Sequence, residues 1–266
     1  MSEQTEREAM LREIARKRVV YMLPGMEALP VRRDLTYRST SGAALLMDVY
    51  YPSLSPDQPL PLVVMPTGYP DPAARVRAYG PLTSWAQLIA ASGMAAVVYG
   101  SETPEEDVHS LLRYLRADAV ALGLDVDRFG VFAASANAAV ALSTLMRDRR
   151  LRCGALLYGY TMDMDRSTTI ADMAREVGFV NACVGKSIDD LPAGTPILFV
   201  RAGRDQFPGL NAALDRVVER ALARNLPLSL INHAAGAHGF DLDEHTPIAR
   251  AIVQQILGFL RLHLTV

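Results

Sequence analysis

The chain has 266 residues, of which half are apolar and 21% are charged, and its formal net charge is −2. This length is typical of one large domain with a sizeable core. The near-neutral charge gives no reason to expect nucleic acid or an anionic membrane as a partner. No early apolar run resembles a signal peptide, and no segment is apolar enough to cross a bilayer, so we expect a cytoplasmic protein.

The two cysteines, Cys153 and Cys183, are too few for a disulfide framework and lack the spacing of metal ligands. We therefore expect buried free thiols and no metal site.

The first third of the chain predicts a helix, a hairpin and then alternating strands and helices. Residues 2–20 place apolar side chains among charges, which predicts an amphipathic surface helix that packs on the body or on a partner subunit. Residues 31–39 and 44–51 alternate β-forming and polar side chains around 40–43, which predicts a hairpin. Residues 61–65 and 94–99 are short apolar runs typical of buried parallel strands. A proline-rich loop (66–72) and a helix (82–92) lie between them.

The alternation continues to the C-terminus. Strands are predicted over 129–133, 153–160, 196–201 and 227–232, and helices over 104–122, 136–146, 210–224 and 247–263. Residues 161–190 break this alternation and are interpreted as an insertion, a small cap over the site. Short apolar strands that alternate with helices predict an α/β fold with a mostly parallel sheet covered by helices on both faces. Residues 31–266 form this domain, and residues 1–30 form a helical extension.

Ser135 stands between an apolar strand and a helix of small residues, with Ala133 two positions before it and Asn137 two positions after it. This arrangement has the shape of a nucleophile elbow, in which a sharp turn tolerates only small neighbours and presents the serine hydroxyl above the sheet edge. The helix that follows directs its N-terminal N–H groups at any oxyanion formed nearby. The pattern is Ala-x-Ser-x-Asn rather than Gly-x-Ser-x-Gly, and the alternative interpretation is a serine that caps a helix.

Ligands of open α/β sheets bind outside the carboxyl ends of the strands, so the loops after the apolar strands are where site residues are expected. Ser135 follows the strand over 129–133, Asp205 follows that over 196–201, and His238 follows that over 227–232. Ser–His–Asp chemistry requires this set, because histidine takes the hydroxyl proton while aspartate orients the imidazole and stabilises the imidazolium. The sequence therefore predicts Ser135, Asp205 and His238 as a catalytic triad.

Two members of this set have alternatives. Asp205 is also compatible with a simple role in a turn, since Gly-Arg-Asp is common in turns. His233 competes with His238 because it directly follows the strand. We favour His238, since Gly236 and Gly239 leave it on a flexible loop that can reach inward, and we interpret His233 as structural.

An oxyanion site needs two aligned donors. We expect the backbone N–H of Ala136 as one donor, since it follows the nucleophile. The other should come from the loop after residues 61–65, with the N–H of Tyr69 favoured and that of Gly68 second. The alternative is that this loop is only a turn made rigid by prolines.

Four further side chains are candidates for contact with substrate. Trp85, Asn137 and Phe207 are expected to line the pocket together with the 161–190 insertion, although Trp85 fits a core position equally well. Glu102 lies in the loop after the strand over 94–99 and is expected to reach the substrate or Arg204, unless it is simply solvated.

These features resemble the α/β-hydrolase fold. The strand–Ser135–helix unit, Arg204-Asp205 in a strand-end loop and Gly-Ala-His238-Gly-Phe carry the resemblance over about residues 31–264. The strand Leu46-Met-Asp-Val-Tyr-Tyr-Pro52 resembles serine esterases near the dienelactone hydrolase and acyl-peptidase branch. The resemblance implies an eight-stranded sheet, hydrolysis through an acyl-enzyme and no cofactor. This sequence departs from the pattern in having serine where dienelactone hydrolases have cysteine, and Pro66-Thr-Gly-Tyr69 in place of a His-Gly-Gly-Gly loop.

The sequence thus favours a serine hydrolase that cleaves a small carboxylic ester or a lactone. A peptidase or amidase of the same fold is the alternative within enzymes. A non-catalytic ligand-binding protein is the alternative outside them, and its support is the missing elbow glycines. The N-terminal and C-terminal helices pack either within the chain or across a homodimer.

Overall fold

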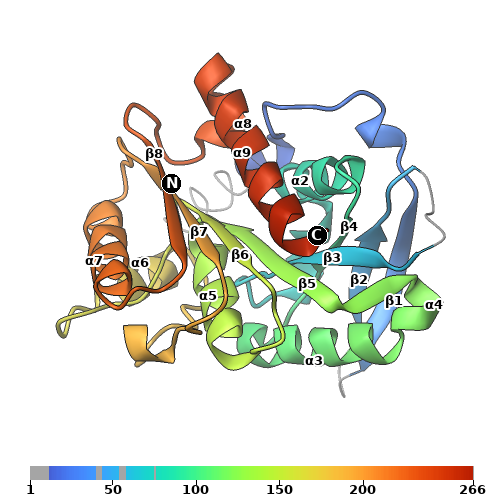
Figure 1. Ribbon diagram of the computed structural model, residues 1–266, viewed down its shortest axis with the longest axis horizontal. Coiled ribbons are helices and arrows are strands. Elements are labelled where there is room, and N and C mark those ends of the chain that lie inside the picture. Colours follow the sequence, from blue (N-terminus) through green and yellow to red (C-terminus); the bar gives the residue numbers. More distant parts are fainter. Residues whose placement is uncertain (1–11, 40–43, 54–57, 75, 266) are drawn as a thin grey trace.

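The computed structural model describes residues 12–39, 44–53, 58–74 and 76–265 (Figure 1). In this part of the chain, eight strands form one sheet in the order β1-β2-β4-β3-β5-β6-β7-β8. The first two pairings, β1 with β2 and β2 with β4, are antiparallel, and all the others are parallel. The strands are β1 (Val31–Ser39), β2 (Ala44–Tyr50), β3 (Leu60–Met65), β4 (Ala95–Tyr99), β5 (Leu124–Ala134), β6 (Gly154–Leu157), β7 (Ile197–Ala202) and β8 (Leu228–His233).

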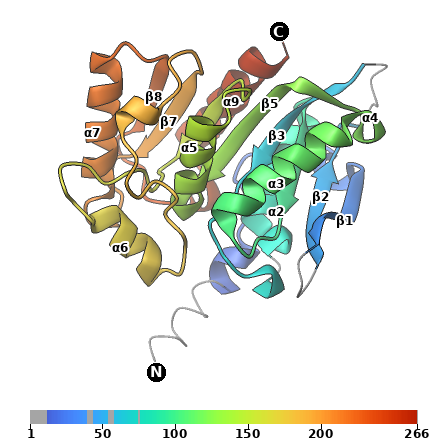
Figure 2. The ribbon, with the colours of Figure 1, turned by 90° about the horizontal axis from the view of Figure 1, so that it is seen from below.

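Helices cover both faces of the sheet (Figure 2). α3, α5 and α7 share one apolar core with one face, while α2 and α9 share a second core with the other. The helices are α2 (Gly80–Ala91), α3 (Pro104–Ala117), α4 (Ala119–Leu122), α5 (Ala138–Arg147), α6 (Thr169–Glu176), α7 (Leu210–Ala223), α8 (Phe240–Asp243) and α9 (Pro247–Leu264). The predicted α/β class, with a mostly parallel sheet between helical layers, is confirmed. β3 and β4 are buried along their whole lengths, which explains their uninterrupted apolar sequences.

Several predicted boundaries differ from the observed ones. The helix predicted over 104–122 divides at Asp118, which leaves helical geometry, so that α3 and α4 are separate. The strand predicted over 129–133 runs from Leu124 to Ala134, because Leu124 already pairs with Leu60 of β3, with an irregular register before Phe129. The strand predicted over 153–160 ends at Leu157, where Tyr158 turns into a left-handed conformation (φ 34°).

The structure describes residues 12–30 of the predicted N-terminal extension and all of the predicted insertion over 161–190. Residues 12–16 are helical, while residues 1–11 and residues 40–43, on which the centre of the predicted hairpin falls, lie outside the described part of the chain. The stretch predicted as a cap over 161–190 contains α6 and a turn of 3-10 helix (Ile188–Asp190). The short helix α8 lies between β8 and α9.

An ion pair joins the C-terminal ends of α3 and α5. Arg116 donates two hydrogen bonds to Asp148, at 2.6 and 3.1 Å, and both side chains are at most 14% exposed. Burial raises the pKa of the Asp148 carboxyl, but the hydrogen bonds and charge of Arg116 outweigh burial and hold the pKa below its ordinary value. The carboxylate therefore stabilises the fold in its charged form.

We expect Asp148→Asn to lower the free energy of unfolding at pH 7 by about 1–3 kcal/mol, because Arg116 loses its charged partner. Because the pKa of Asp148 is lower in the folded than in the unfolded state, its carboxylate stabilises the fold fully at pH values above the unfolded-state pKa of about 3.9. This stabilisation is lost as the pH falls through the pKa of Asp148 in the folded state. Thermal unfolding of the wild type and of Asp148→Asn from about pH 7 to pH 3 measures this loss. The difference in stability between the two proteins should shrink on acidification. A difference that stays constant over this range contradicts the assignment.

Candidate active site

Ser135 occupies a sharp turn between β5 and α5. β5 ends at Ala134, residues Ser135–Asn137 form one turn of 3-10 helix, and α5 begins at Ala138. Ser135 itself has φ 57°, a left-handed backbone conformation that residues other than glycine rarely adopt. A hydrogen bond from Tyr160 N–H to the Ser135 carbonyl oxygen (3.1 Å) supports the turn. The hydroxyl thus stands at the carboxyl end of the sheet, in the geometry of a nucleophile elbow.

The structure brings the three predicted triad residues into one chain of hydrogen bonds. Ser135 Oγ lies 2.7 Å from His238 Nε2, and His238 Nδ1 lies 2.7 Å from Asp205 Oδ2. Asp205 is 1% exposed at its side chain and also accepts a hydrogen bond from Phe207 N–H (2.9 Å). With the Nδ1 proton directed at the carboxylate, Nε2 is an acceptor for the serine hydroxyl.

His233, the rival histidine, lies elsewhere. It is 4% exposed, and its Nε2 lies 2.9 Å from Glu244 Oε2. This contact ties the end of β8 to the loop before α9 and agrees with the structural role predicted for His233.

Two backbone hydrogen bonds hold the loops after β7 and β8 together. Gly203 N–H donates to the His233 carbonyl oxygen and Arg204 N–H donates to that of Gly236, both at 2.8 Å. A Cβ atom on Gly203 would overlap the backbone of Ala234. The glycine therefore permits the close approach that sets the distance between Asp205 and His238.

The loop after β3 contacts the elbow through Gly68 and Asn137. Gly68 N–H donates to the side-chain oxygen of Asn137 (2.9 Å), and Tyr69 N–H makes a longer contact with Thr67 Oγ1 (3.3 Å). The N–H of Gly68, the second choice for an oxyanion donor, is therefore engaged by Asn137. Asn137 occupies the place where an elbow glycine is usual and links the elbow to this loop.

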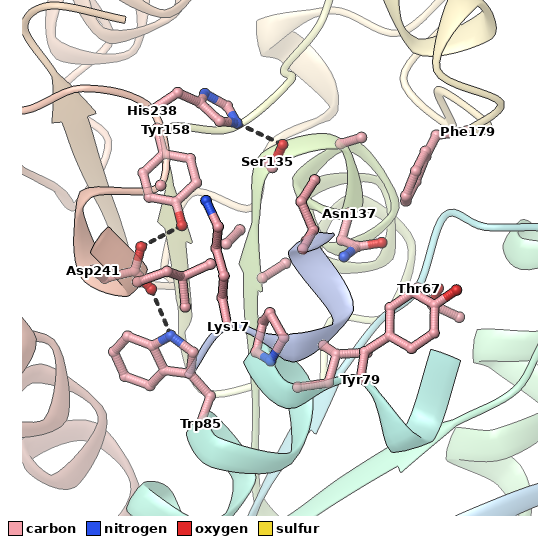
Figure 3. A pocket seen from close by; sticks show the side chains of 18 of the residues that line it. Lys17, Thr67, Tyr79, Trp85, Ser135, Asn137, Tyr158, Phe179, His238 and Asp241 are labelled. Carbon is pink, nitrogen blue, oxygen red and sulfur yellow. Dashed lines mark hydrogen bonds between the residues drawn. The ribbon is translucent and has the colours of Figure 1, made fainter. Parts of the chain in front are cut away.

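A cavity of about 370 Å³ opens beside Ser135 (Figure 3). Its walls are mostly apolar and aromatic. They come from the β3 loop, the elbow, the segment after β6, the 161–190 stretch and the loops that carry the other triad residues. The lining includes Thr67, Tyr69, Tyr79, Trp85, Ser135, Asn137, Tyr158, Tyr160, Val177, Phe179, Phe207, His238 and Asp241.

Three of the four predicted substrate-contacting residues lie at this cavity, namely Trp85, Asn137 and Phe207. Trp85 is 2% exposed, so it is both a core residue and part of the wall. Glu102 is not brought to the cavity. It is exposed at the start of α3, where its N–H donates to Asp107 Oδ2 (2.8 Å). A position after a strand end therefore did not suffice to place this side chain in the site.

The N-terminal segment is a part of the site that the sequence did not identify. Glu13, Ile14 and Lys17 line the cavity. The segment is fastened by Val19 N–H to Ser84 Oγ (3.0 Å), and Val20 N–H donates to the carbonyl oxygen of Asp241 (2.7 Å). The apolar residues within 2–20 predicted that this segment packs against another surface, but their spacing does not identify that surface.

Comparisons with known proteins agree with this architecture. A thermostable esterase from Pseudomonas putida superposes with a TM-score of 0.74 and 15% identity, over 100% of this chain and 91% of that one. A thermophilic carboxylesterase cloned from a metagenomic library has a TM-score of 0.71 and 16% identity, over 99% and 98%. A bacterial heroin esterase has a TM-score of 0.69 and 16% identity, over 92% and 87%. The chain has the α/β-hydrolase fold.

No known family profile matches the chain, and no curated protein matches it in sequence. At such low identity the likeness establishes the α/β-hydrolase fold, while the resemblance to the dienelactone hydrolase and acyl-peptidase branch stays a prediction. In this fold the nucleophile elbow, the acid loop and the histidine loop stand at the carboxyl ends of parallel strands, where Ser135, Asp205 and His238 are found.

Cys153 and Cys183 are free and buried, as expected, and burial raises the pKa of each thiol to about 12. Within the described residues, no group of three or more His, Cys, Asp or Glu side chains is arranged to hold a metal ion. In the same part of the chain, no helix has the length and apolar character required to cross a membrane.

We expect Gly203→Ala to separate the Asp205 and His238 loops. The added Cβ meets backbone rather than a flexible side chain, so the fold should lose about 1–3 kcal/mol of stability. A small misplacement of His238 should also slow labelling of Ser135 by a fluorophosphonate about 100-fold. Gly258→Ala is the matched control, since a Cβ there meets nothing within 4 Å. Equal labelling rates for the two variants would contradict this role of Gly203.

We expect Gly80→Ala to displace the N-terminal segment, because a Cβ on Gly80 would overlap the carbonyl oxygen of Lys17. Hydrogen–deuterium exchange should then rise by about tenfold or more at the amides of Val19 and Val20, which are hydrogen-bonded in the wild type. Exchange in α5 should not change. Unaltered protection of Val19 and Val20 would show that the segment adapts to the larger side chain.

Proposed function

We propose that this protein is a serine hydrolase that cleaves a small carboxylic ester or lactone. The observation that carries the proposal is the continuous hydrogen-bonded series from Ser135 through His238 to Asp205, which opens on a mostly apolar cavity. The α/β-hydrolase fold and its similarity to esterases support the proposal, although fold alone does not specify a reaction.

In the proposed mechanism, Ser135 Oγ attacks the ester carbonyl carbon while its proton passes to His238 Nε2. Asp205 orients the imidazole through Nδ1 and stabilises the imidazolium. When the tetrahedral intermediate collapses, the C–O bond to the alcohol breaks and His238 returns the proton to the leaving oxygen. Water then attacks the acyl-enzyme by the same route, its proton passing to His238 and from there to Ser135 Oγ as the acid is released.

The developing oxyanion needs donors at the elbow. We assign this role to the backbone N–H groups of Ala136 and Tyr69. Gly68 is not assigned, because its N–H is already hydrogen-bonded to Asn137. The contact between Tyr69 N–H and Thr67 Oγ1 is long at 3.3 Å, so an anionic oxygen would compete for this donor effectively.

The cavity walls favour a compact, uncharged substrate. Apolar and aromatic side chains predominate, with Tyr69 and Phe179 in edge-to-face contact on one side of Ser135 and Phe207 against His238. Residues of the N-terminal segment and of the 161–190 stretch add further walls. Nothing among the described residues favours the peptidase or amidase alternative, or the non-catalytic one. The cytoplasmic location and the homodimer stay predictions.

Hydrolysis of p-nitrophenyl esters from acetate to decanoate tests the proposal. Wild type should be active and prefer short acyl chains, since the cavity is small, and Ser135→Ala should lower kcat by about 10³-fold or more. A fluorophosphonate should label wild type and not Ser135→Ala. Absence of labelling under conditions that label a known serine hydrolase would favour the non-catalytic alternative. Full activity in Ser135→Ala would show that another nucleophile acts.

A further inference from the structure

A second carboxylate lies behind the proposed triad. Asp241, in α8, is 1% exposed and forms part of the cavity wall. Trp85 Nε1–H donates to its Oδ2 (2.7 Å), and the hydroxyl of Tyr158 donates to its Oδ1 (Figure 3). The mechanism proposed above uses none of these three residues. Both oxygens of a deeply buried acid thus accept hydrogen bonds from neutral donors.

Tyr158 links this carboxylate to His238. Its ring centroid lies 4.5 Å from that of the imidazole with 58° between the planes, and Phe207 stands 4.6 Å from the imidazole at 74°. His238 therefore has an aromatic ring on two sides and Asp205 on its Nδ1.

The backbone fixes Tyr158 in this place. Its φ of 34° lies in the region that residues other than glycine rarely adopt, and its N–H donates to the Val200 carbonyl oxygen (2.6 Å). The next residue, Gly159, lies so close to α5 that a Cβ would overlap that of Ala138. A tyrosine held in an unfavourable conformation, between the elbow helix and the catalytic imidazole, indicates a constraint from the site.

We propose that Asp241 and Tyr158 are positioning residues for His238: the carboxylate fixes the tyrosine ring against the imidazole and adds a negative field that favours the imidazolium. This inference rests on the proposed serine hydrolase function. A ring whose hydroxyl donates to a carboxylate presents a more electron-rich π-face, and such a face attracts a cation. The field would act most strongly after Ser135 has given its proton to His238, so it would stabilise the transition state more than the bound substrate.

Burial and the neighbouring groups act in opposite directions on the charge of Asp241. Burial raises the pKa of Asp241 above its ordinary value, and the hydrogen bonds from Tyr158 and Trp85 and the charge of His238 oppose that rise without cancelling it. The field of Asp241 acts on His238 at pH values where the carboxyl is ionised. Burial, followed by the charge of Asp241, raises the pKa of Tyr158 far above its ordinary value, so its hydroxyl stays a donor. Among the described residues, the other charged groups at the site are Asp205, on His238, and Glu13, Lys17 and Asp243 in the cavity wall, where Lys17 pairs with Asp243 (2.8 Å) and with Glu13 (3.9 Å).

Two variants separate the charge of Asp241 from the hydroxyl of Tyr158. Asp241→Asn keeps the shape and removes the charge, and Tyr158→Phe keeps the ring and removes the hydroxyl. For both we expect kcat on p-nitrophenyl acetate to fall about tenfold with KM within about twofold, since the effect belongs to the transition state. In Asp241→Asn the acidic limb of the pH–rate profile should also move to lower pH, by about 0.5–1 pH unit, because loss of a nearby negative charge disfavours the imidazolium.

Asp148→Asn is the matched control, because it removes a partly buried, hydrogen-bonded carboxylate at the opposite end of α5 from Ser135. It should lower the melting temperature without moving the acidic limb. If folded Asp241→Asn and Tyr158→Phe keep the wild-type kcat and pH profile, the network is structural and the proposal is wrong. If Asp241→Asn does not fold, Tyr158→Phe decides the question by its kcat.

An NMR titration of the His238 imidazole distinguishes failure of this proposal from failure of the proposed function. It needs no substrate, and the midpoint for His238 should move to lower pH in Asp241→Asn and stay in place in Asp148→Asn. If the wild type is inactive but the midpoint moves in Asp241→Asn, the hydrolase function is overturned and the coupling between Asp241 and His238 is retained. If the wild type is active but the midpoint does not move, the hydrolase function is retained and the coupling is overturned.

Discussion

The close approach of the loops after β7 and β8 is the constraint on which the site depends. Parallel pairing of these strands carries both loops to the same sheet edge, and the hydrogen bonds from Gly203 and Arg204 then join them. The acid and the imidazole come from positions 33 residues apart in sequence, yet they meet at 2.7 Å. Because the backbones themselves are joined, this geometry does not depend on flexible side chains, and His238 reaches Ser135 from a fixed base.

The elbow shows how the turn is made without its usual glycines. Ser135 adopts a left-handed conformation, and Ala133 takes the place of the first glycine with a side chain that is still small. Asn137 replaces the second glycine and uses its side-chain oxygen to hold the N–H of Gly68. The departure from the common motif thus has a structural consequence: a side chain ties the elbow to the loop that faces it.

The cavity walls join segments that are far apart in the sequence. The N-terminal segment rests on the start of α2 and contacts α8 through Val20, while Phe179, from the 161–190 stretch, makes an edge-to-face contact with Tyr69. Behind these walls, Trp85 of α2 and Tyr158 after β6 converge on Asp241 of α8. The backbone carbonyl of Asp241 thus accepts a hydrogen bond from Val20 of the N-terminal segment, while its side chain is linked to the His238 imidazole through Tyr158.

The sequence by itself determined the layered α/β architecture and the strand ends at which Ser135, Asp205 and His238 stand. These features follow from local pattern, since apolar runs identify buried strands and the carboxyl ends of parallel strands share an edge. Only the tertiary structure decided that Glu102 faces away, that Asn137 engages Gly68, that residues 12–17 reach the cavity, and that Asp241 is joined to Trp85 and Tyr158. Each of these depends on which distant backbone lies within hydrogen-bonding reach of a side chain. Periodicity reveals that a face is apolar or that a residue follows a strand, but not which partner lies opposite it in space.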